Sequence, residues 1–494
     1  MKKNMIYAHL LFIMVVLSFS CKKDFLNRNP LDKISSETFW KNEADLRAAL
    51  AGCYAILSPR DNPGFGALAP HYEGLSDNAY DNFPWEGGFT TLAQGIITPN
   101  SGGAVATEYN LHYQQIAADN FLLDNIDKVP VDDAIKAKYK AESRFLRAYS
   151  YFRLSEAFGG VILSLKVETL SETKRPKNTK AEVVAAILDD LDFAIANLPD
   201  QAYAGNAVKG SAQALKAKVL LYNEKWKESA TVSKAIIDGA KFSLSPEYSN
   251  LFIKPGQLGN PEIIFSARYQ TPDAYSNMDI YYSFWQSLQP LKLLVDAYET
   301  IDGSPINPAD PYSNRDPRLK KTILLPGEPH VGSSTGIFVP FSGDNKTGFL
   351  PKKFVDPNLN AQQTSNSDCV ILRYSDVLLM YAEAQNEDLG PEASVYDAVN
   401  KVRQRPGINM PVLPIGLSKE QMRERIRKER RIEFAMEGTR YFDLKRWHIA
   451  HIVLPAVVDP GGIKRSFAQK NYLWPFPQAE INILSPNLVQ NDDY

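Results

Sequence analysis

"SAQALKAKVLLYNEKWKESATVSKAIIDG" (residues 211–239) predicts two helices joined by a short turn. Apolar residues recur every three or four positions on both sides of the polar triplet at 223–225, which is the period of an amphipathic helix. Small and aromatic residues stand on the expected inner faces: Ala214, Tyr222, Trp226 and Ala230. Because each apolar face must be buried against a neighbour, this stretch favours a fold built from packed helices.

The pattern of small and aromatic residues in 211–239 is similar to that of a tetratricopeptide helix pair. Residues 376–407 show a weaker form of it, with a break at Leu389-Gly390-Pro391. No strict repeat period runs through the chain, so we do not expect a pure repeat array. Helix pairs of this kind stack, share one core and act as a scaffold.

Other helices are predicted from the same period and from their end signals. Thr179 precedes one of them, and Gly159-Gly160 stop another. Ser418 and Gln421 form a capping box before a third. The additional predicted helical segments are 35–57, 109–126, 140–160, 179–199 and the segment that starts at Ser418.

Long irregular segments separate the helical blocks, at 58–108, 243–290 and 302–368. Loops of this length in a compact domain tend to be functional or disordered. Their aromatic content argues against disorder. We therefore predict a mainly α fold with tetratricopeptide-like helix pairs and long loops that contain short strands.

The first residues have the features of a secretory signal. Lys2 and Lys3 precede a short apolar run, Leu10 to Leu17, and Ser18-Phe19-Ser20-Cys21 follows. The run is too short to span a bilayer, which takes about 20 apolar residues. A Cys at this place resembles a bacterial lipoprotein signal, so residues 1–20 are a predicted signal peptide and Cys21 a predicted lipidation site. The alternative is an ordinary signal in which the Cys occurs by chance.

Charge and cysteine content exclude several classes of protein. The 494 residues include 55 basic and 57 acidic side chains, a balance that argues against nucleic-acid binding. Only Cys53 and Cys369 follow Cys21, which is no disulfide framework and fits no zinc spacing. A G-x-S-x-G string at 332–336 lies in a polar stretch and is predicted to be a loop. No cofactor motif is present, so no cofactor or metal is expected. A structural calcium ion held by oxygen ligands of the Asp- and Asn-rich loops stays an alternative.

Two loop segments are unusually aromatic: "HYEGLSDNAYDNFPWEGGF" (71–89) and "RYQTPDAYSNMDIYYSFW" (268–285). The whole chain is 11% aromatic, whereas one residue in three is aromatic between 268 and 285. Aromatic rings beside polar groups suit a ligand with an apolar face and a hydroxylated edge, such as a sugar. The candidate ligand-binding residues are Tyr72, Asp77, Asn78, Phe83, Trp85, Tyr275, Tyr282 and Trp285, with Arg373 and Asp61 as weaker candidates.

Carboxylates in the first aromatic loop leave room for a different function. Asp77, Asp81 and Glu86 lie close together in the sequence. A glycosidase needs two carboxyl groups roughly 5–10 Å apart, and sequence does not supply that distance. A surface glycosidase is therefore an alternative hypothesis to ligand binding.

The segment "ERRIEFAMEGTRYFDLKRW" (429–447) is the densest mixture of charged and aromatic side chains in the chain. The helix that starts at Ser418 places Glu429 and Glu433 on the same face as Met422 and Ile426. Buried carboxylates must be paired. The sequence therefore predicts buried ion pairs, for which the nearby arginines are Arg425, Arg430 and Arg440.

Taken in order, several segments resemble the SusD/RagB family of outer-membrane lipoproteins. They are Cys21-Lys22-Lys23-Asp24-Phe25-Leu26, "LRAYSYFRLSEAFGGV" (146–161), "NPEIIF" (260–265), "NRDPRL" (314–319), "ILRYSDVLLMYAEAQNE" (371–387), "RRIEFAMEGTRYFDLKRW" (430–447) and "WPFPQAEINILSPNLVQNDDY" (474–494). The resemblance implies one SusD-like domain at 21–494, with an N-terminal part at about 21–230 and a C-terminal RagB/SusD part at about 260–494.

The resemblance also implies a function. Members of this family bind nutrients, usually oligosaccharides, without catalysis and deliver them to a SusC-like TonB-dependent transporter. The lipid at Cys21 would anchor the protein in the outer membrane, and Asp24 resembles the signal for export to the cell exterior. Binding of another nutrient, such as peptides, remains an alternative.

Overall fold

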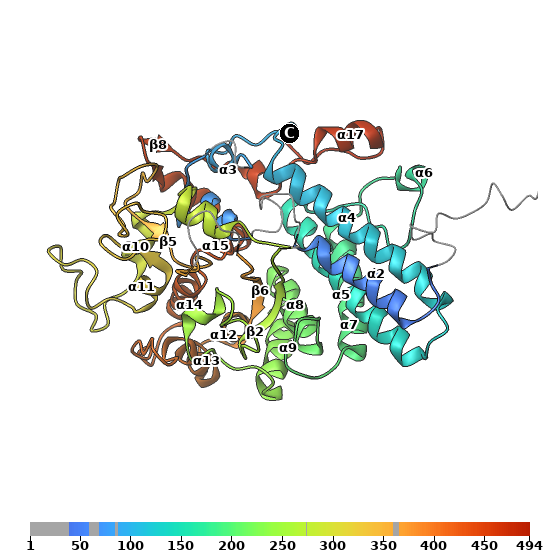
Figure 1. Ribbon diagram of the computed structural model, residues 1–494, viewed down its shortest axis with the longest axis horizontal. Coiled ribbons are helices and arrows are strands. Elements are labelled where there is room, and N and C mark those ends of the chain that lie inside the picture. Colours follow the sequence, from blue (N-terminus) through green and yellow to red (C-terminus); the bar gives the residue numbers. More distant parts are fainter. Residues whose placement is uncertain (1–38, 59–68, 84–86, 273, 359–364) are drawn as a thin grey trace, which may run out of the picture.

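The computed structural model describes residues 39–58, 69–83, 87–272, 274–358 and 365–494. Long helices dominate these ranges and pack one against the next through most of the molecule (Figure 1). In chain order they are α2 (Glu43–Ile56), α4 (Ala104–Asn125), α5 (Asp133–Phe158), α7 (Lys180–Asn197), α8 (Lys209–Tyr222), α9 (Trp226–Gly239), α12 (Tyr374–Leu389), α13 (Ala393–Arg403) and α14 (Lys419–Glu433). The prediction of a mainly α fold is confirmed.

Short elements fill the segments between the long helices. The short helices are η2 (Ala69–Leu75), α3 (Phe89–Ala93), η3 (Ile126–Lys128), α6 (Leu170–Thr173), η4 (Tyr248–Leu251), η5 (Ile280–Phe284), α10 (Lys292–Ala297), α11 (Arg318–Thr322), α15 (Arg440–Arg446), α16 (Ala450–Val453), η6 (Leu454–Ala456), η7 (Gln469–Tyr472) and α17 (Gln478–Leu484). The strands form four antiparallel pairs: β1 (Ala79–Asp81) with β3 (Leu288–Pro290), β2 (Ile263–Ala267) with β6 (Cys369–Arg373), β4 (Ile323–Leu324) with β5 (Leu350–Pro351), and β7 (Val458–Asp459) with β8 (Ile463–Lys464). Short strands inside the loops were predicted and are confirmed.

The predicted helix pairs are present. Helices α8 and α9 are separated at 223–225, and α12 and α13 at 390–392, where the sequence placed the breaks. Helix α9 also packs against α12, so the two pairs form one continuous helical layer. In Figure 1 this layer lies between the N-terminal helices α2, α4, α5 and α7 and the loops that carry α10 and α11.

Helix ends follow the capping signals in most cases. Thr179 caps α7, Ser418 caps α14, and Gly159 ends α5 with a φ of 76°. The predicted start of the first helix is wrong: α2 begins at Glu43, and Asn42 is its cap. The Asn42 side chain accepts from backbone N–H groups while Asp45 bonds back to it, so this later capping box sets the boundary.

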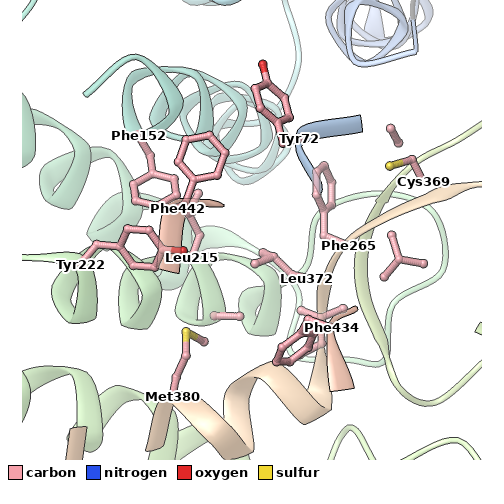
Figure 2. Close-up of a cluster of buried hydrophobic side chains, with 14 of the residues drawn as sticks. Tyr72, Phe152, Leu215, Tyr222, Phe265, Cys369, Leu372, Met380, Phe434 and Phe442 are labelled. Atoms are coloured by element: carbon pink, nitrogen blue, oxygen red, sulfur yellow. The ribbon is translucent and has the colours of Figure 1, made fainter. Parts of the chain in front are cut away.

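One hydrophobic core runs through both halves of the chain. Figure 2 shows part of it, where Phe152 of α5, Leu215 and Tyr222 of α8, and Phe442 of α15 lie close together. Residues more than 200 positions apart in the sequence therefore share one packed interior. This shared core holds the long loops on a rigid base.

The apolar stripe of α14 continues as a row of buried carboxylates, as predicted. Glu429 and Glu433 are both almost completely buried, on the same face as Met422 and Ile426. Glu433 accepts hydrogen bonds from three guanidinium groups, at 2.9 Å from Arg318 and 2.6 Å from each of Arg373 and Arg405. We call Glu429, Glu433 and their arginine partners the ion cluster.

The predicted partners of these carboxylates are wrong. Arg425 pairs with Glu299, Arg430 with Asp376 and Asp443, and Arg440 with Asp77. Neighbouring residues on a helix point about 100° apart, because 3.6 residues complete a turn. Arg430 therefore points to the side of Glu429 and Glu433, toward Asp376 and Asp443.

Candidate functional site

The two aromatic segments predicted from the sequence lie side by side. Strand β1 of the first segment pairs with β3, which directly follows the second, and Ala79 stands opposite Pro290. The pairing is extended by a hydrogen bond of 2.8 Å from the Asn82 amide to the Ser287 carbonyl oxygen. Loops about 200 residues apart in the chain thus form one surface.

A cluster of buried aromatic rings packs beneath this surface. His71 stacks on Tyr282 with 5.7 Å between ring centroids and meets the edge of Tyr281 at 5.8 Å. Phe89 lies 5.4 Å from the His71 ring on another side. All four rings are buried, so they fix the shape of the loops.

Two aromatic side chains at the end of η5 face outward. Phe284 is 41% exposed and Trp285 is 38% exposed. Trp285 contacts the edge of buried Tyr281, with ring centroids 5.1 Å apart, so the indole is held in place while part of its face is open to solvent. We call the area around these two rings the aromatic surface.

A third loop, residues 338–349, is bound to the first two by its backbone. The side-chain amides of Asn82 and Gln289 donate to the Asp344 carbonyl oxygen at 3.0 and 2.8 Å. The Lys346 amide donates in return to the Gln289 side chain at 2.7 Å. This loop presents Phe341, which is 71% exposed and which sequence reasoning missed.

Tyr72, Asn78 and Tyr282 were predicted to contact the ligand, but the structure places all three in the interior. The Tyr72 hydroxyl donates to Glu108 at 2.5 Å, and its ring lies in the core shown in Figure 2. Asn78 donates to Glu73 at 2.8 Å. These residues pack the loops onto the helices, so we correct the prediction and remove them from the candidate site.

Asp77 and Arg373 also have structural partners. Asp77 is buried between Arg440 at 2.8 Å and Arg431 at 3.0 Å. Burial raises the pKa of Asp77, but the two guanidinium groups outweigh it and hold that pKa below its usual value. Arg373 belongs to the ion cluster, where a ligand has no access to it. These two predictions are corrected for the same reason.

The remaining candidates have different positions. Phe83 and Tyr275 are half-buried in the two aromatic segments and stay in the candidate site. Trp85, Asp61 and the lipidation site Cys21 lie outside the described residues. Phe284 was missed as an individual candidate, although it stands within the aromatic-rich segment that pointed to this surface.

Other sequence features have no role at the aromatic surface. The G-x-S-x-G string at 332–336 is a turn, as predicted, in which the Ser333 and Thr335 hydroxyls lie 2.8 Å apart. Among the described residues, no group of three or more His, Cys, Asp or Glu side chains could hold a metal ion. Within the same residues, no helix has the length and apolar character needed to cross a membrane.

Two family models together match most of the chain. The model described as the SusD family matches residues 260–494, and the model described as "Starch-binding associating with outer membrane" matches residues 24–221. The chain belongs to the SusD family. The resemblance drawn from the short sequence motifs is thus confirmed, whereas the domain boundaries drawn from them stay a prediction.

Relatives in the SusD family are similar over most of their length. A SusD-like protein of Formosa agariphila is 27% identical over 524 residues, which covers 100% of this chain and 99% of that protein. A SusD-like protein of Bacteroides ovatus is 26% identical over 459 residues, covering 87% and 80% of the two chains. The crystal structure of a SusD-like carbohydrate-binding protein from Bacteroides fragilis superposes with a TM-score of 0.81 at 28% identity, covering 90% of this chain and 99% of that one.

Proposed function

We propose that this protein is a cell-surface lipoprotein that binds oligosaccharides without cleaving them and delivers them to a SusC-like TonB-dependent transporter. The aromatic surface carries the proposal. Phe284 and Trp285 present partly open rings on a rigid base, next to a loop with the exposed side chains of Phe341, Asp344 and Lys346. Rings for the C–H face of a sugar and polar groups for its hydroxyls are what an oligosaccharide requires.

The family supports the same ligand class. The similar structure from Bacteroides fragilis is described as a carbohydrate-binding protein, and its fold covers nearly the whole of this chain. The family model matched by residues 24–221 is described by starch binding and by association with the outer membrane. To this description our proposal adds that a lipid on Cys21 anchors the present chain and that the chain delivers its ligand to a transporter.

The proposal of binding without cleavage rests on the surroundings of the acidic residues. Asp77, one of the carboxylates considered for a glycosidase, stays ionised between Arg431 and Arg440 and is buried. Asp81 is buried as well, below the aromatic surface. A general acid must be protonated at working pH and must reach the glycosidic oxygen, and Asp77 meets neither condition.

Calorimetric titration of the mature protein with a panel of oligosaccharides tests the proposal. We expect binding that weakens about tenfold or more in Trp285→Ala and Phe284→Ala, since rings at the centre of a binding surface carry most of its free energy. The matched control is Phe121→Ala, because Phe121 is 47% exposed but lies on α4, away from this surface. Absence of binding throughout the panel, or equal affinities in all variants, would contradict the proposal.

The alternatives give different results in the same assay. Binding of peptides without binding of oligosaccharides would favour another nutrient taken up in the same way. Release of shorter sugars after long incubation, abolished by Asp77→Asn or Asp81→Asn, would favour a glycosidase. Genes for a SusC-like transporter and glycosidases beside this gene, with co-purification of the transporter, would support the delivery step.

A further inference from the structure

A pocket of about 350 Å³ opens beside η5. Apolar side chains from several segments form its walls, among them Phe252, Leu324, Val331, Leu350 and Val355. The volume lies within the range of about 300–1,000 Å³ that is typical of small-ligand sites. The cavity beside Arg373 has only about 70 Å³, so it has room for a few water molecules but not for a sugar ring.

The titratable side chains that line the 350 Å³ pocket are four lysines and one histidine. They are the lysines Lys320, Lys321, Lys352 and Lys353 and the imidazole of His330, and no Asp or Glu is among the described residues that line the pocket. Apolar walls with several ammonium groups fit a ligand that has both an apolar face and a negative charge. We call this site the lysine pocket.

The four lysines differ in how far their charge is balanced. Three have carboxylate partners outside the lining: Lys321 with Glu247 at 2.7 Å, Lys352 with Glu328 at 2.9 Å, and Lys353 with Glu437 at 2.7 Å. Lys320 is exposed, and no carboxylate of the described residues lies within 4.0 Å of its ammonium group. The Lys320 backbone carbonyl accepts a hydrogen bond of 2.9 Å from the Lys352 ammonium group, which places that group beside the Lys320 backbone.

The lysine pocket adjoins the aromatic surface through η5. Ser283 lines the pocket, and its carbonyl oxygen accepts a hydrogen bond from His330 Nε2 at 3.0 Å. Only one residue separates Ser283 from Trp285, so their Cα atoms are at most about 7 Å apart. The aromatic surface and the lysine pocket therefore meet along the backbone of η5.

We propose that the lysine pocket is a subsite for an acidic sugar residue, with a carboxylate or a sulfate ester, of the oligosaccharide held at the aromatic surface. The apolar walls would contact the ring face of the sugar, while Lys320 and Lys352 bind the anionic substituent. The inference rests on the proposed function and names its ligand class as acidic glycans. It also explains why Lys320, which has no carboxylate partner among the described residues, lines a pocket with apolar walls.

Calorimetric titration with matched oligosaccharides tests this inference. The probes are uronic-acid oligosaccharides with their carboxyl-reduced counterparts, and sulfated oligosaccharides with their desulfated counterparts. We expect at least one acidic probe to bind about tenfold or more tightly than its neutral counterpart, with an affinity that falls as NaCl rises from about 50 to about 500 mM. The pair that shows the difference distinguishes a carboxylate from a sulfate.

Two variants connect the effect to the pocket. Lys320→Ala and the charge reversal Lys320→Glu should remove most of the preference for the acidic probe and leave binding of the neutral counterpart unchanged. Lys227→Ala is the control, because Lys227 is also exposed but lies on α9. A folded Lys320→Glu protein, checked by its thermal transition, that keeps the full preference would overturn the inference.

The remaining outcomes separate this inference from the proposed function. If neutral oligosaccharides bind as well as acidic ones and the Lys320 variants match the wild type, the lysine pocket is no subsite although glycan binding stands. If octanoate binds in the pocket and no acidic oligosaccharide competes with it, the site is for another amphiphilic anion and the inference is wrong. If no oligosaccharide of either kind binds, both proposals fail.

Discussion

The guanidinium group of Arg373 lies 2.6 Å from a carboxylate oxygen of Glu433, and both side chains are almost completely buried. Arg373 is the last residue of β6 and Glu433 the last of α14, so this contact joins the central strand pair to the most charged helix. Arg373 also donates to Glu262 at 2.9 Å and to Glu437 at 2.7 Å. Its guanidinium group therefore holds three chain segments together.

Replacing Glu433 by Ala should lower the free energy of unfolding by about 3–5 kcal/mol, because three buried guanidinium groups would lose a shared partner. Urea denaturation measures this change. The control is Glu424→Ala on the same helix, since Glu424 is exposed and its pair with Arg427 should contribute less than about 1 kcal/mol. A stable Glu433→Ala protein that lost only ligand binding would contradict the scaffold role of the ion cluster.

The ion cluster also predicts a dependence of stability on pH. Burial raises the pKa of Glu433, but Arg405, Arg373 and Arg318 outweigh it and hold that pKa well below the ordinary value of 4.5. A carboxyl group whose pKa is lower in the folded protein than in the unfolded chain stabilises the fold at pH values above its unfolded-state pKa. This stabilisation is lost progressively as the pH falls below that unfolded-state pKa. The difference in unfolding free energy between the wild type and Glu433→Gln should thus shrink as the pH falls below 4.5, with a slope that approaches about 1.4 kcal/mol for each pH unit. Urea titrations at several pH values measure it, and a difference that stays constant would show that Glu433 is not ionised in the native state.

Signals that act over a few residues were enough to predict much of the fold. Thr179 and Ser418 begin helices where the sequence placed them, because a cap bonds to the backbone two or three residues away. The burial of Glu433 followed from its place on the helical period. The partners of Glu433 did not, because Arg318, Arg373 and Arg405 come from other segments and reach it only after the helices pack.

The candidate site was predictable as a region and not residue by residue. The aromatic content of 71–89 and 268–285 pointed to this surface, and β1 and β3 bring the two segments together. Tyr282 and Trp285 have opposite exposures although they are three residues apart. Tyr282 lies within η5 and Trp285 at its end, and this helix is too short to show a period in the sequence, so composition could not separate the inward ring from the outward one.

Asp77 and Trp285 should show opposite effects when replaced. Asp77→Ala leaves Arg431 and Arg440 without their shared carboxylate, so the unfolding free energy should fall by about 2 kcal/mol, between the values for exposed and fully buried pairs. Oligosaccharide affinity should stay within about twofold of the wild type. Trp285→Ala should lose affinity while stability changes by no more than about 1 kcal/mol. The reverse pattern, measured by calorimetry and denaturation of both variants, would return Asp77 to the ligand site.

Cys21→Ser should release the protein from the membrane. The predicted anchor is attached through the Cys21 sulfur, which serine lacks, and the acyl chains provide the hydrophobic free energy of membrane association. Cell fractionation should find the wild type with the outer membrane and the variant in soluble fractions. An unchanged membrane fraction for Cys21→Ser would show that another segment or partner holds the protein there.

Gly160 should not tolerate a side chain. A Cβ atom at this position would lie 2.2 Å from the backbone carbonyl oxygen of Asn178, and the Asn178 amide bonds to the Val161 carbonyl oxygen at 2.9 Å, which leaves the two segments little freedom to separate. Gly160→Ala should therefore lower the free energy of unfolding by about 2 kcal/mol or more. Gly52→Ala is the matched control, because Gly52 lies on an exposed part of α2 where, beyond the backbone of its own helix, no atom of the described residues lies within 4 Å of the Cβ position; this change should stabilise the protein by about 0.5–1 kcal/mol. Thermal unfolding of the two variants measures both effects, and equal shifts would show that the contact between Gly160 and Asn178 does not constrain the chain.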